Sequence, residues 1–222
     1  LSRSGVAHVV VAEAFVTAST ENDNIDSPAA WAAPDGKTWL FATAKEGPGL
    51  TLYDGDTGET WRSYGTEGDA PGQFRRVNGI NIVDDLLFVV ERDNHRVQVL
   101  QLPGFAPLGM VGEDVLKVPY GLWLRETGPD ELEIFVTDSF MTDFRTRELP
   151  PMAELDQRVK RFAVHVDDDG KLQSRYLGAF GDTTEEGALR MVESIAGDAV
   201  NDRLLIAEED RRVGSTLREY DL

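Results

Sequence analysis

The sequence predicts an all-β fold, and more narrowly a β-propeller of four-stranded antiparallel blades. Short apolar runs alternate with turns rich in Gly, Asp and Pro. These runs recur in groups of four, with a period of roughly 40–50 residues that is typical of propeller blades. Helical periodicity is nearly absent, and the best helical candidate is the segment 152–159.

Four units follow one another along a single predicted domain, 1–222. They cover residues 29–65, 78–112, 119–181 and 192–222, and the third contains an insertion at about 139–158, rich in Pro and charge. The fourth unit stops after three strands. The apolar, β-branched run 6–18 reads as another strand. Either this run completes the fourth blade, or further blades exist beyond the sequence.

Composition limits the classes of partner and chemistry. With 40 acidic and 22 basic residues the net charge is −18, which argues against nucleic acid or an anionic membrane as partner. No run of about 18 apolar residues predicts a membrane span. There are no cysteines, so disulfides and thiolate sites are excluded, and the three histidines lack the spacing of a zinc site. Neither a GxSxG nor a GxGxxG motif occurs.

Acidic residues cluster in the stretch 191–210. Glu193 opens one apolar run, the polar turn 201–203 follows, and a second apolar run leads into Glu208, Glu209 and Asp210. Two antiparallel strands return the chain to its starting end, so we expect Glu193 and the 208–210 acids on one rim. Converging carboxylates raise one another's pKa unless a cation lies between them. Oxygen ligands suit a hard cation such as calcium. The plainer alternative is a strand end with solvated acids.

Four motifs in order resemble the β-propeller phytase family. They are ENDNIDSPAAW at 21–31, ATAKEGPGLTLYDGDTGE at 42–59, PYGLWL at 119–124 and VESIAGDAVNDRLLIAEED at 192–210. The likeness runs from about residue 12 to residue 222. Separately, GQFRRVNGINIVDDLLFVVERDNHRVQVL at 72–100 looks like an NHL repeat, which is another kind of propeller blade.

The phytase resemblance implies a six-bladed propeller that hydrolyses phytate or a similar phosphomonoester with calcium as cofactor. It also implies a monomeric, secreted or periplasmic protein whose partner is a small phosphorylated substrate. Carried over by position, the calcium ligands would be Asp26, Tyr120, Glu193 and Glu209. The phosphate-binding residues would be Lys45 and Arg92, so that Lys45, Arg92 and Glu209 form the catalytic set. Metal ions would reverse the sign of an acidic face for an anionic substrate.

The sequence also departs from the family pattern. Ser27 replaces an acid, Glu46 replaces a basic residue, Asn78-Gly79-Ile80 lacks an expected acid, and Ser194 replaces a glycine. Each candidate has an ordinary structural alternative. Asp26 could belong to a turn, Lys45 could pair with Glu46, Arg92 could pair with a neighbouring acid, and Tyr120 could be a core residue.

Two other functions fit a propeller. The first is a non-catalytic, NHL-like propeller that binds a protein or ligand on its face. The second is a lactonase-type hydrolase with one calcium ion in the central channel, held by Glu and Asn ligands. The fold alone does not choose among the three.

Overall fold

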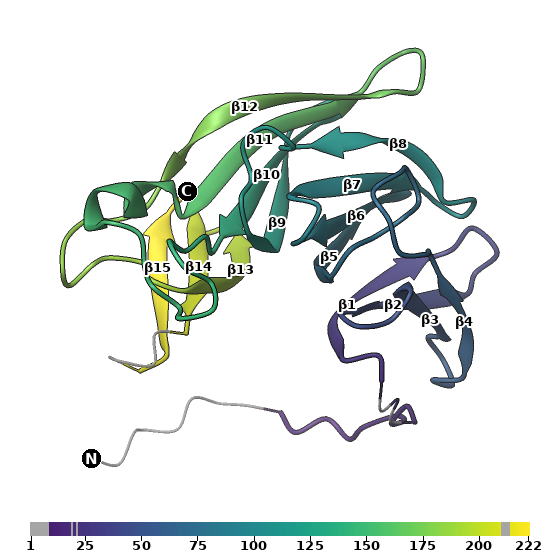
Figure 1. Ribbon diagram of the computed structural model, residues 1–222. Coiled ribbons are helices and arrows are strands. Elements are labelled where there is room, and N and C mark those ends of the chain that lie inside the picture. Colours follow the sequence, from purple (N-terminus) through teal and green to yellow (C-terminus); the bar gives the residue numbers. More distant parts are fainter. Residues whose placement is uncertain (1–8, 19, 21, 210–213) are drawn as a thin grey trace.

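The computed structural model describes residues 9–18, 20, 22–209 and 214–222, and these form four antiparallel sheets arranged as propeller blades (Figure 1). The all-β prediction is therefore confirmed. Three blades have four strands and the last has three. The blades follow the chain: β1 (Ile25–Ala32), β2 (Thr38–Ala44), β3 (Gly49–Asp54) and β4 (Thr60–Tyr64); β5 (Val77–Val83), β6 (Leu86–Glu91), β7 (Arg96–Gln101) and β8 (Ala106–Val111); β9 (Pro119–Gly128), β10 (Glu131–Asp138), β11 (Val159–Val166) and β12 (Leu172–Phe180); β13 (Val192–Asp198), β14 (Arg203–Glu208) and β15 (Thr216–Asp221).

The strand order within each blade follows the chain without crossovers. The innermost strands β1, β5, β9 and β13 contact one another in sequence, so the blades form an arc around a common centre (Figure 1). Such a meander needs only short hairpin turns. Residues that end the innermost strands of different blades therefore lie near one another at the centre of the arc.

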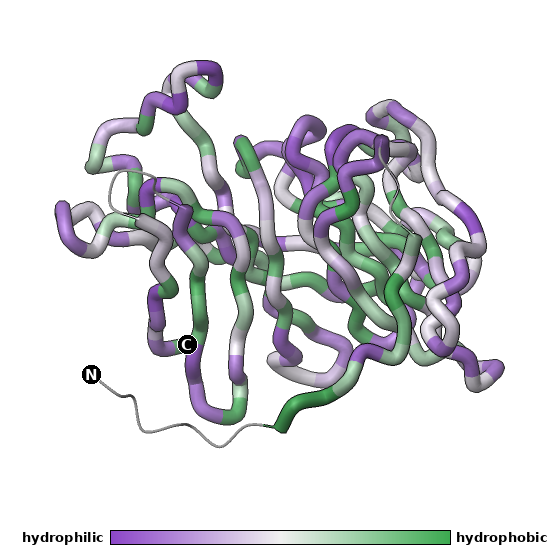
Figure 2. Tube along the Cα trace, turned by 90° about the horizontal axis from the view of Figure 1, so that it is seen from below, coloured by the Kyte–Doolittle hydropathy of each residue, from purple (hydrophilic) through white to green (hydrophobic). Residues whose placement is uncertain are grey.

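Three hydrophobic clusters join successive blades. Trp31 and Phe41 pack with Leu87 and Val89 between the first and second blades. The intervening residue Phe88 faces the third blade, because side chains along a strand alternate between its two faces. A third cluster joins the last two blades. The second and third sheets are thus apolar on both faces, and Figure 2 shows hydrophilic residues collecting in the turns.

The prediction of a strand at 6–18 is wrong for residues 9–18, which are the part of this segment that the structure describes. Residues 9–18 form no strand, and residues 6–8 lie outside the described residues. Val9, Val10 and Val11 are each more than four-fifths exposed. β-propensity forms a strand only against a partner, and this segment pairs with no sheet among the described residues.

The helical candidate at 152–159 is a short 3₁₀ helix, η1 (Met152–Gln157), that buries Leu155. It lies in the insertion of the third blade, which the structure places between β10 and β11. No helix among the described residues has the length and hydropathy needed to cross a bilayer.

Candidate functional site

The innermost strands carry the same irregularity in all four blades. In each, two consecutive residues oppose a single residue of the second strand, which is a β-bulge. The first residues of the four bulges are Asp26, Asn78, Tyr120 and Glu193. Three of the proposed calcium ligands therefore occupy one repeated position, and Asn78 is its fourth member.

The ends of the second strands supply a second repeated position. β2, β6, β10 and β14 end at Ala44, Glu91, Asp138 and Glu208. The next residues are Lys45, Arg92, Ser139 and Glu209. All six site residues predicted from the sequence thus belong to two rings at one end of the arc. We call this end the site face.

Glu208 lines one cavity together with Glu193 and Glu209, but its side chain is buried rather than exposed beside Glu209. Alternation along the strand turns Glu208 inward, where only 2% of the residue is exposed. It accepts a hydrogen bond from the backbone N of Arg190 at 2.7 Å and faces Arg218 at 3.5 Å. Asp210 lies outside the described residues.

Buried acids at the ends of the second strands hold the loops that lead into the site. Asp138 accepts hydrogen bonds from the backbone N of Lys117 and of Val118, both at 2.8 Å. Glu91 does the same for Arg75 at 3.2 Å. Charge-assisted bonds to a backbone N–H are stronger than neutral ones. These acids therefore fix where each inner strand, and its bulge residue, begins.

Two threonine hydroxyls tie neighbouring bulges together. Thr43 Oγ1 donates to the backbone O of Asn78 at 2.7 Å, and Thr137 Oγ1 donates to the backbone O of Glu193 at 2.6 Å. Each hydroxyl also accepts from a backbone N of its own blade, from Ser27 at 3.0 Å and Gly121 at 2.8 Å. The backbone at Glu193 is thus fixed by the third blade.

Replacing Gly121 with alanine is expected to disturb this junction. A Cβ at Gly121 would lie 2.6 Å from the backbone O of Glu193, and backbone atoms cannot move aside cheaply. Overpacking of this kind costs roughly 1–3 kcal/mol, measurable by urea unfolding. Gly104→Ala is the matched control, because its Cβ would meet no atom within 4 Å. Equal stability of the two variants would contradict the tight junction.

Among the described residues, two cavities on the site face are lined by basic residues, and a third of about 240 Å³ is lined by Glu193, Glu208 and Glu209 with their neighbours. The lysine cavity, about 310 Å³, is lined by Asp26, Ser27, Pro28, Lys45, Asn78, Tyr120, Gly121, Glu193 and Ser194. The arginine cavity, about 160 Å³, is lined by Arg76, Arg92, Tyr120, Ser139, Met141, Phe144, Arg147, Met191, Glu193 and Glu209. Tyr120 and Glu193 border both cavities. The two cavities therefore form one continuous candidate site.

The basic residues of the site are held by polar partners. Lys45 Nζ lies 2.8 Å from Asp26 Oδ1, not against Glu46, and 5.8 Å from the centre of the Tyr120 ring. Glu46 instead faces Arg76 at 3.6 Å. Arg92 pairs with Asp93 at 2.6 Å. Burial lowers the pKa of Arg92, but Asp93 and a hydrogen bond to Tyr120 outweigh it and raise the pKa overall.

Glu193 and Glu209 form the acidic part of the site. Burial is the main cause of a raised pKa at Glu193, and the charge and hydrogen bond of Glu209 raise that pKa further. Lys45 acts in the opposite direction, while Asp26 adds to the rise. The sequence predicted this convergence and its effect on pKa. Neither carboxylate forms an ion pair with any other residue that the structure describes.

Sequence reasoning missed Arg76, Arg147, Phe144 and Asn78. Arg76 precedes β5, while Phe144 and Arg147 belong to the insertion, so no strand pattern marks them. Phe144 is 47% exposed and lies 5.2 Å from the Arg92 guanidinium. Asn78 could have been found by aligning the four bulges, because it stands where the other blades have Asp26, Tyr120 and Glu193.

The fit of this site to a hard cation is partial. Within the described ranges no group of three or more His, Cys, Asp or Glu side chains could hold a metal ion. The Glu193–Glu209 pair nevertheless supplies carboxylate oxygens that no ion pair among the described residues occupies. Asn78 adds a buried amide whose two polar atoms have no hydrogen-bond partner among the described residues. Carboxylate and amide oxygens are the ligands that calcium prefers.

Comparison with known proteins extends the fold assignment. No protein-family model and no curated protein sequence matches the chain. Among solved structures, hydrazine synthase of Kuenenia stuttgartiensis matches 96% of this chain and 49% of its own, at 12% identity and a TM-score of 0.53. A "putative 6-phosphogluconolactonase" from Bacteroides uniformis matches 92% and 58%, at 12% identity and a TM-score of 0.51.

A protein of unknown function from Bacteroides caccae matches 94% of this chain and 67% of its own, at 16% identity and a TM-score of 0.50. The chain thus spans about half the length of the first two structures. At such identities the likeness concerns the fold and not the activity. The chain is a four-bladed β-propeller structure, and its chemistry must be argued from the site face.

Proposed function

We propose that the protein is a calcium-dependent phosphomonoester hydrolase that acts on phytate or a similar phosphorylated substrate. One observation carries the proposal: a carboxylate pair, Glu193 and Glu209, borders a cavity that also contains three arginines. Clustered carboxylates attract a cation, whereas clustered guanidinium groups bind phosphate. A site for a metal-assisted reaction of a phosphate ester requires both kinds of group side by side.

The residues divide by chemistry. Glu193, Glu209, Asp26 and Tyr120 would hold calcium, with Asn78 as a further oxygen ligand in the same ring. Bound calcium would polarise a phosphoryl oxygen and lower the pKa of coordinated water. Lys45 would contribute a point charge to the phosphate and Arg92 a planar pair of donors.

Two departures from the phytase pattern have a structural account. Glu46 pairs with Arg76, so it is placed to orient one of the arginines. Ser27 Oγ donates to Asp26 Oδ2 at 3.3 Å, so a hydroxyl supports the remaining acid. Both residues thus support members of the proposed site.

The test is phosphate release from phytate and from p-nitrophenyl phosphate, in millimolar calcium and in excess chelator. We expect release only with calcium. Arg92→Gln should lower kcat/KM roughly 10- to 100-fold, since a hydrogen bond to a charged group contributes about 1.5–3 kcal/mol. Arg145→Gln is the control, because Arg145 lies on the same insertion side of the site but is 93% exposed and outside the cavity.

Absence of release from either substrate by the folded, calcium-loaded protein would overturn the proposal. The non-catalytic propeller would then be the better hypothesis. Hydrolysis that persists in chelator would reject calcium dependence alone.

A further inference from the structure

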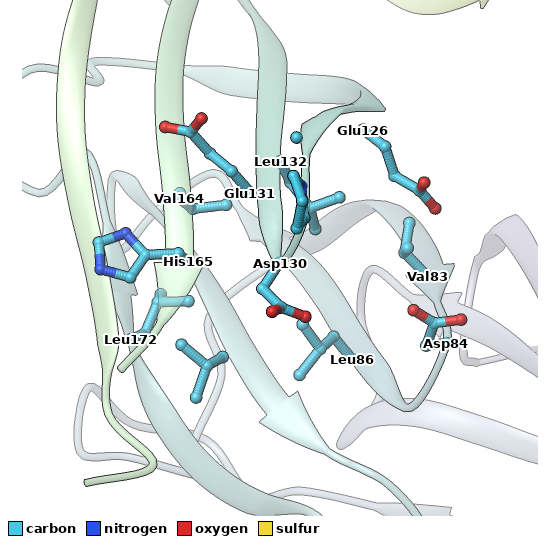
Figure 3. A pocket seen from close by; sticks show the side chains of 13 residues that line it. Val83, Asp84, Leu86, Glu126, Asp130, Glu131, Leu132, Val164, His165 and Leu172 are labelled. Atoms are coloured by element: carbon cyan, nitrogen blue, oxygen red, sulfur yellow. The ribbon is translucent and has the colours of Figure 1, made fainter. Parts of the chain in front are cut away.

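Two adjoining cavities form a groove at the end of the blades opposite the site face. This end carries the turns between the first two strands of each blade, and we call it the hairpin face. One cavity of about 330 Å³ lies between the second and third blades, with an apolar floor of Val83, Leu86, Leu132, Val164 and Leu172 (Figure 3). A second, of about 490 Å³, lies between the first and second blades and includes Trp31 and Ile82.

The two cavities are neighbours, because Asp84 lines both of them. The floor of the first is the open end of the hydrophobic cluster between the second and third blades. Apolar side chains therefore line the cavity between the second and third blades, and a more polar cavity adjoins it at Asp84. An occupant that covers this groove must be elongated and must carry apolar groups.

The rim of the groove is acidic. Asp84, Glu126, Asp130 and Glu131 line the first cavity, and all four are exposed. Figure 3 shows Asp84 and Glu126 on one side, His165 on the other and Asp130 between them. Neither cavity is lined by a lysine or arginine. Within the part of the chain that the structure describes, none of the four acids forms an ion pair.

We propose that this groove binds an extended peptide segment of a partner protein in which lysine or arginine alternates with aliphatic residues. The aliphatic side chains cover the apolar floor, and burying them supplies hydrophobic free energy. The basic side chains face the unpaired carboxylates, which supply orientation and selectivity. A polyamine matches the charge but lacks side chains for the floor. The groove is independent of the proposed catalytic site, because it lies at the opposite ends of the strands.

The repeated hairpin turns provide structure-preserving variants. Asp84, Asp130 and Asp202 all have left-handed backbone conformations, with φ of 49°, 60° and 52°. Asparagine adopts this conformation as readily as aspartate. Asp84→Asn with Asp130→Asn therefore removes two charges from the groove while keeping both turns. Asp202→Asn makes the same change in the fourth blade, away from both cavities.

The experiment is a ¹⁵N–¹H NMR titration of the protein with three short peptides of equal length. One alternates leucine with lysine, one leucine with glutamate, and one serine with lysine. We expect only the leucine–lysine peptide to shift the signals of residues 82–86, 126–132 and 164–172. Raised salt should weaken the binding of this peptide. The variant with both Asp84→Asn and Asp130→Asn should bind the leucine–lysine peptide roughly tenfold more weakly. Asp202→Asn should bind it with the same affinity as the parent protein.

Four results would overturn the inference. If the glutamate peptide bound as tightly as the leucine–lysine peptide, the acidic rim would have no role in selectivity. If the serine peptide bound as tightly, the apolar floor would have no role in affinity. An equal loss in Asp202→Asn would show only the general attraction of a chain with charge −18. No shift at the groove with any peptide would likewise reject it. Phosphate release is measured separately, so failure here leaves the proposed function standing.

Discussion

Replacing Asp138 with alanine is expected to lower the free energy of unfolding by about 3–5 kcal/mol, the cost of breaking a buried ion pair. Asp138 is fully buried and accepts from Lys160 Nζ at 2.5 Å. Without the carboxylate, Lys160, which is 3% exposed, keeps the Val115 backbone O at 2.6 Å and the Phe140 ring at 5.6 Å, neither of which carries a charge. Burial already lowers the pKa of Lys160 and Asp138 opposes this, so the variant leaves an uncompensated buried ammonium.

The loss should have a local component beyond the charge. Asp138 also binds the backbone N of Lys117 and Val118, just before β9. Urea unfolding of Asp138→Ala, Lys160→Met and the double variant measures the coupling. The double variant should recover part of the stability, because removing both charges costs less than removing one. A loss in Asp138→Ala below about 1 kcal/mol, the range of an exposed pair, would contradict the buried network.

Glu193→Gln is expected to reverse its effect on stability when calcium is added. In chelator the variant should be more stable than the parent at neutral pH, because Glu193 has a raised pKa in the folded state. The folded protein then binds the proton more tightly than the unfolded chain, so ionisation of Glu193 costs stability. This cost is absent below the ordinary pKa of 4.5 and is complete above the folded-state pKa.

With calcium the parent protein should be more stable than Glu193→Gln. A ligand present at 100 times its dissociation constant stabilises by about 2.7 kcal/mol, a rise of several degrees in Tm. Glu193→Gln removes one of the three carboxylates that would hold the ion, and the one that borders both the lysine and the arginine cavity, so it should lose most of this rise. The measurement is Tm against pH in chelator and in calcium. Glu154→Gln, an exposed acid on η1, is the control.

An equal calcium-induced rise in the parent and in Glu193→Gln would place the ion elsewhere. Equal stability of the two proteins at all pH values in chelator would contradict the raised pKa at Glu193. Because the two results are separate, the charge repulsion and the metal site are tested independently.

The strands were predictable because their cause is local. In Arg96–Leu100 and Glu131–Phe135 the alternation of side chains, followed by turn residues, specifies a strand whatever its neighbours are. The run 6–18 is also rich in β-branched residues, yet residues 9–18 form no strand. Propensity and burial favour a strand only where a sheet edge accepts it, and the sequence does not contain that information in one segment.

The convergence of Glu193 with Glu209 was also visible, since a hairpin brings its two ends together. The direction of Glu208 was not, because a single step along a strand turns a side chain to the other face. Likewise the pairing of Lys45 with Asp26 rather than Glu46 depends on how β1 and β2 bring their ends together.

By itself, the sequence determined the all-β class, the repeating blades and the convergence of Glu193 with Glu209. Only the tertiary structure decided that Arg76 and Arg147 join Arg92 around one cavity, that Asn78 completes the ring of bulges, and that a groove opens on the hairpin face. The reason is physical. Periodicity acts between residues a few positions apart, whereas cavities arise where separate blades pack, and their spacing depends on every side chain between them.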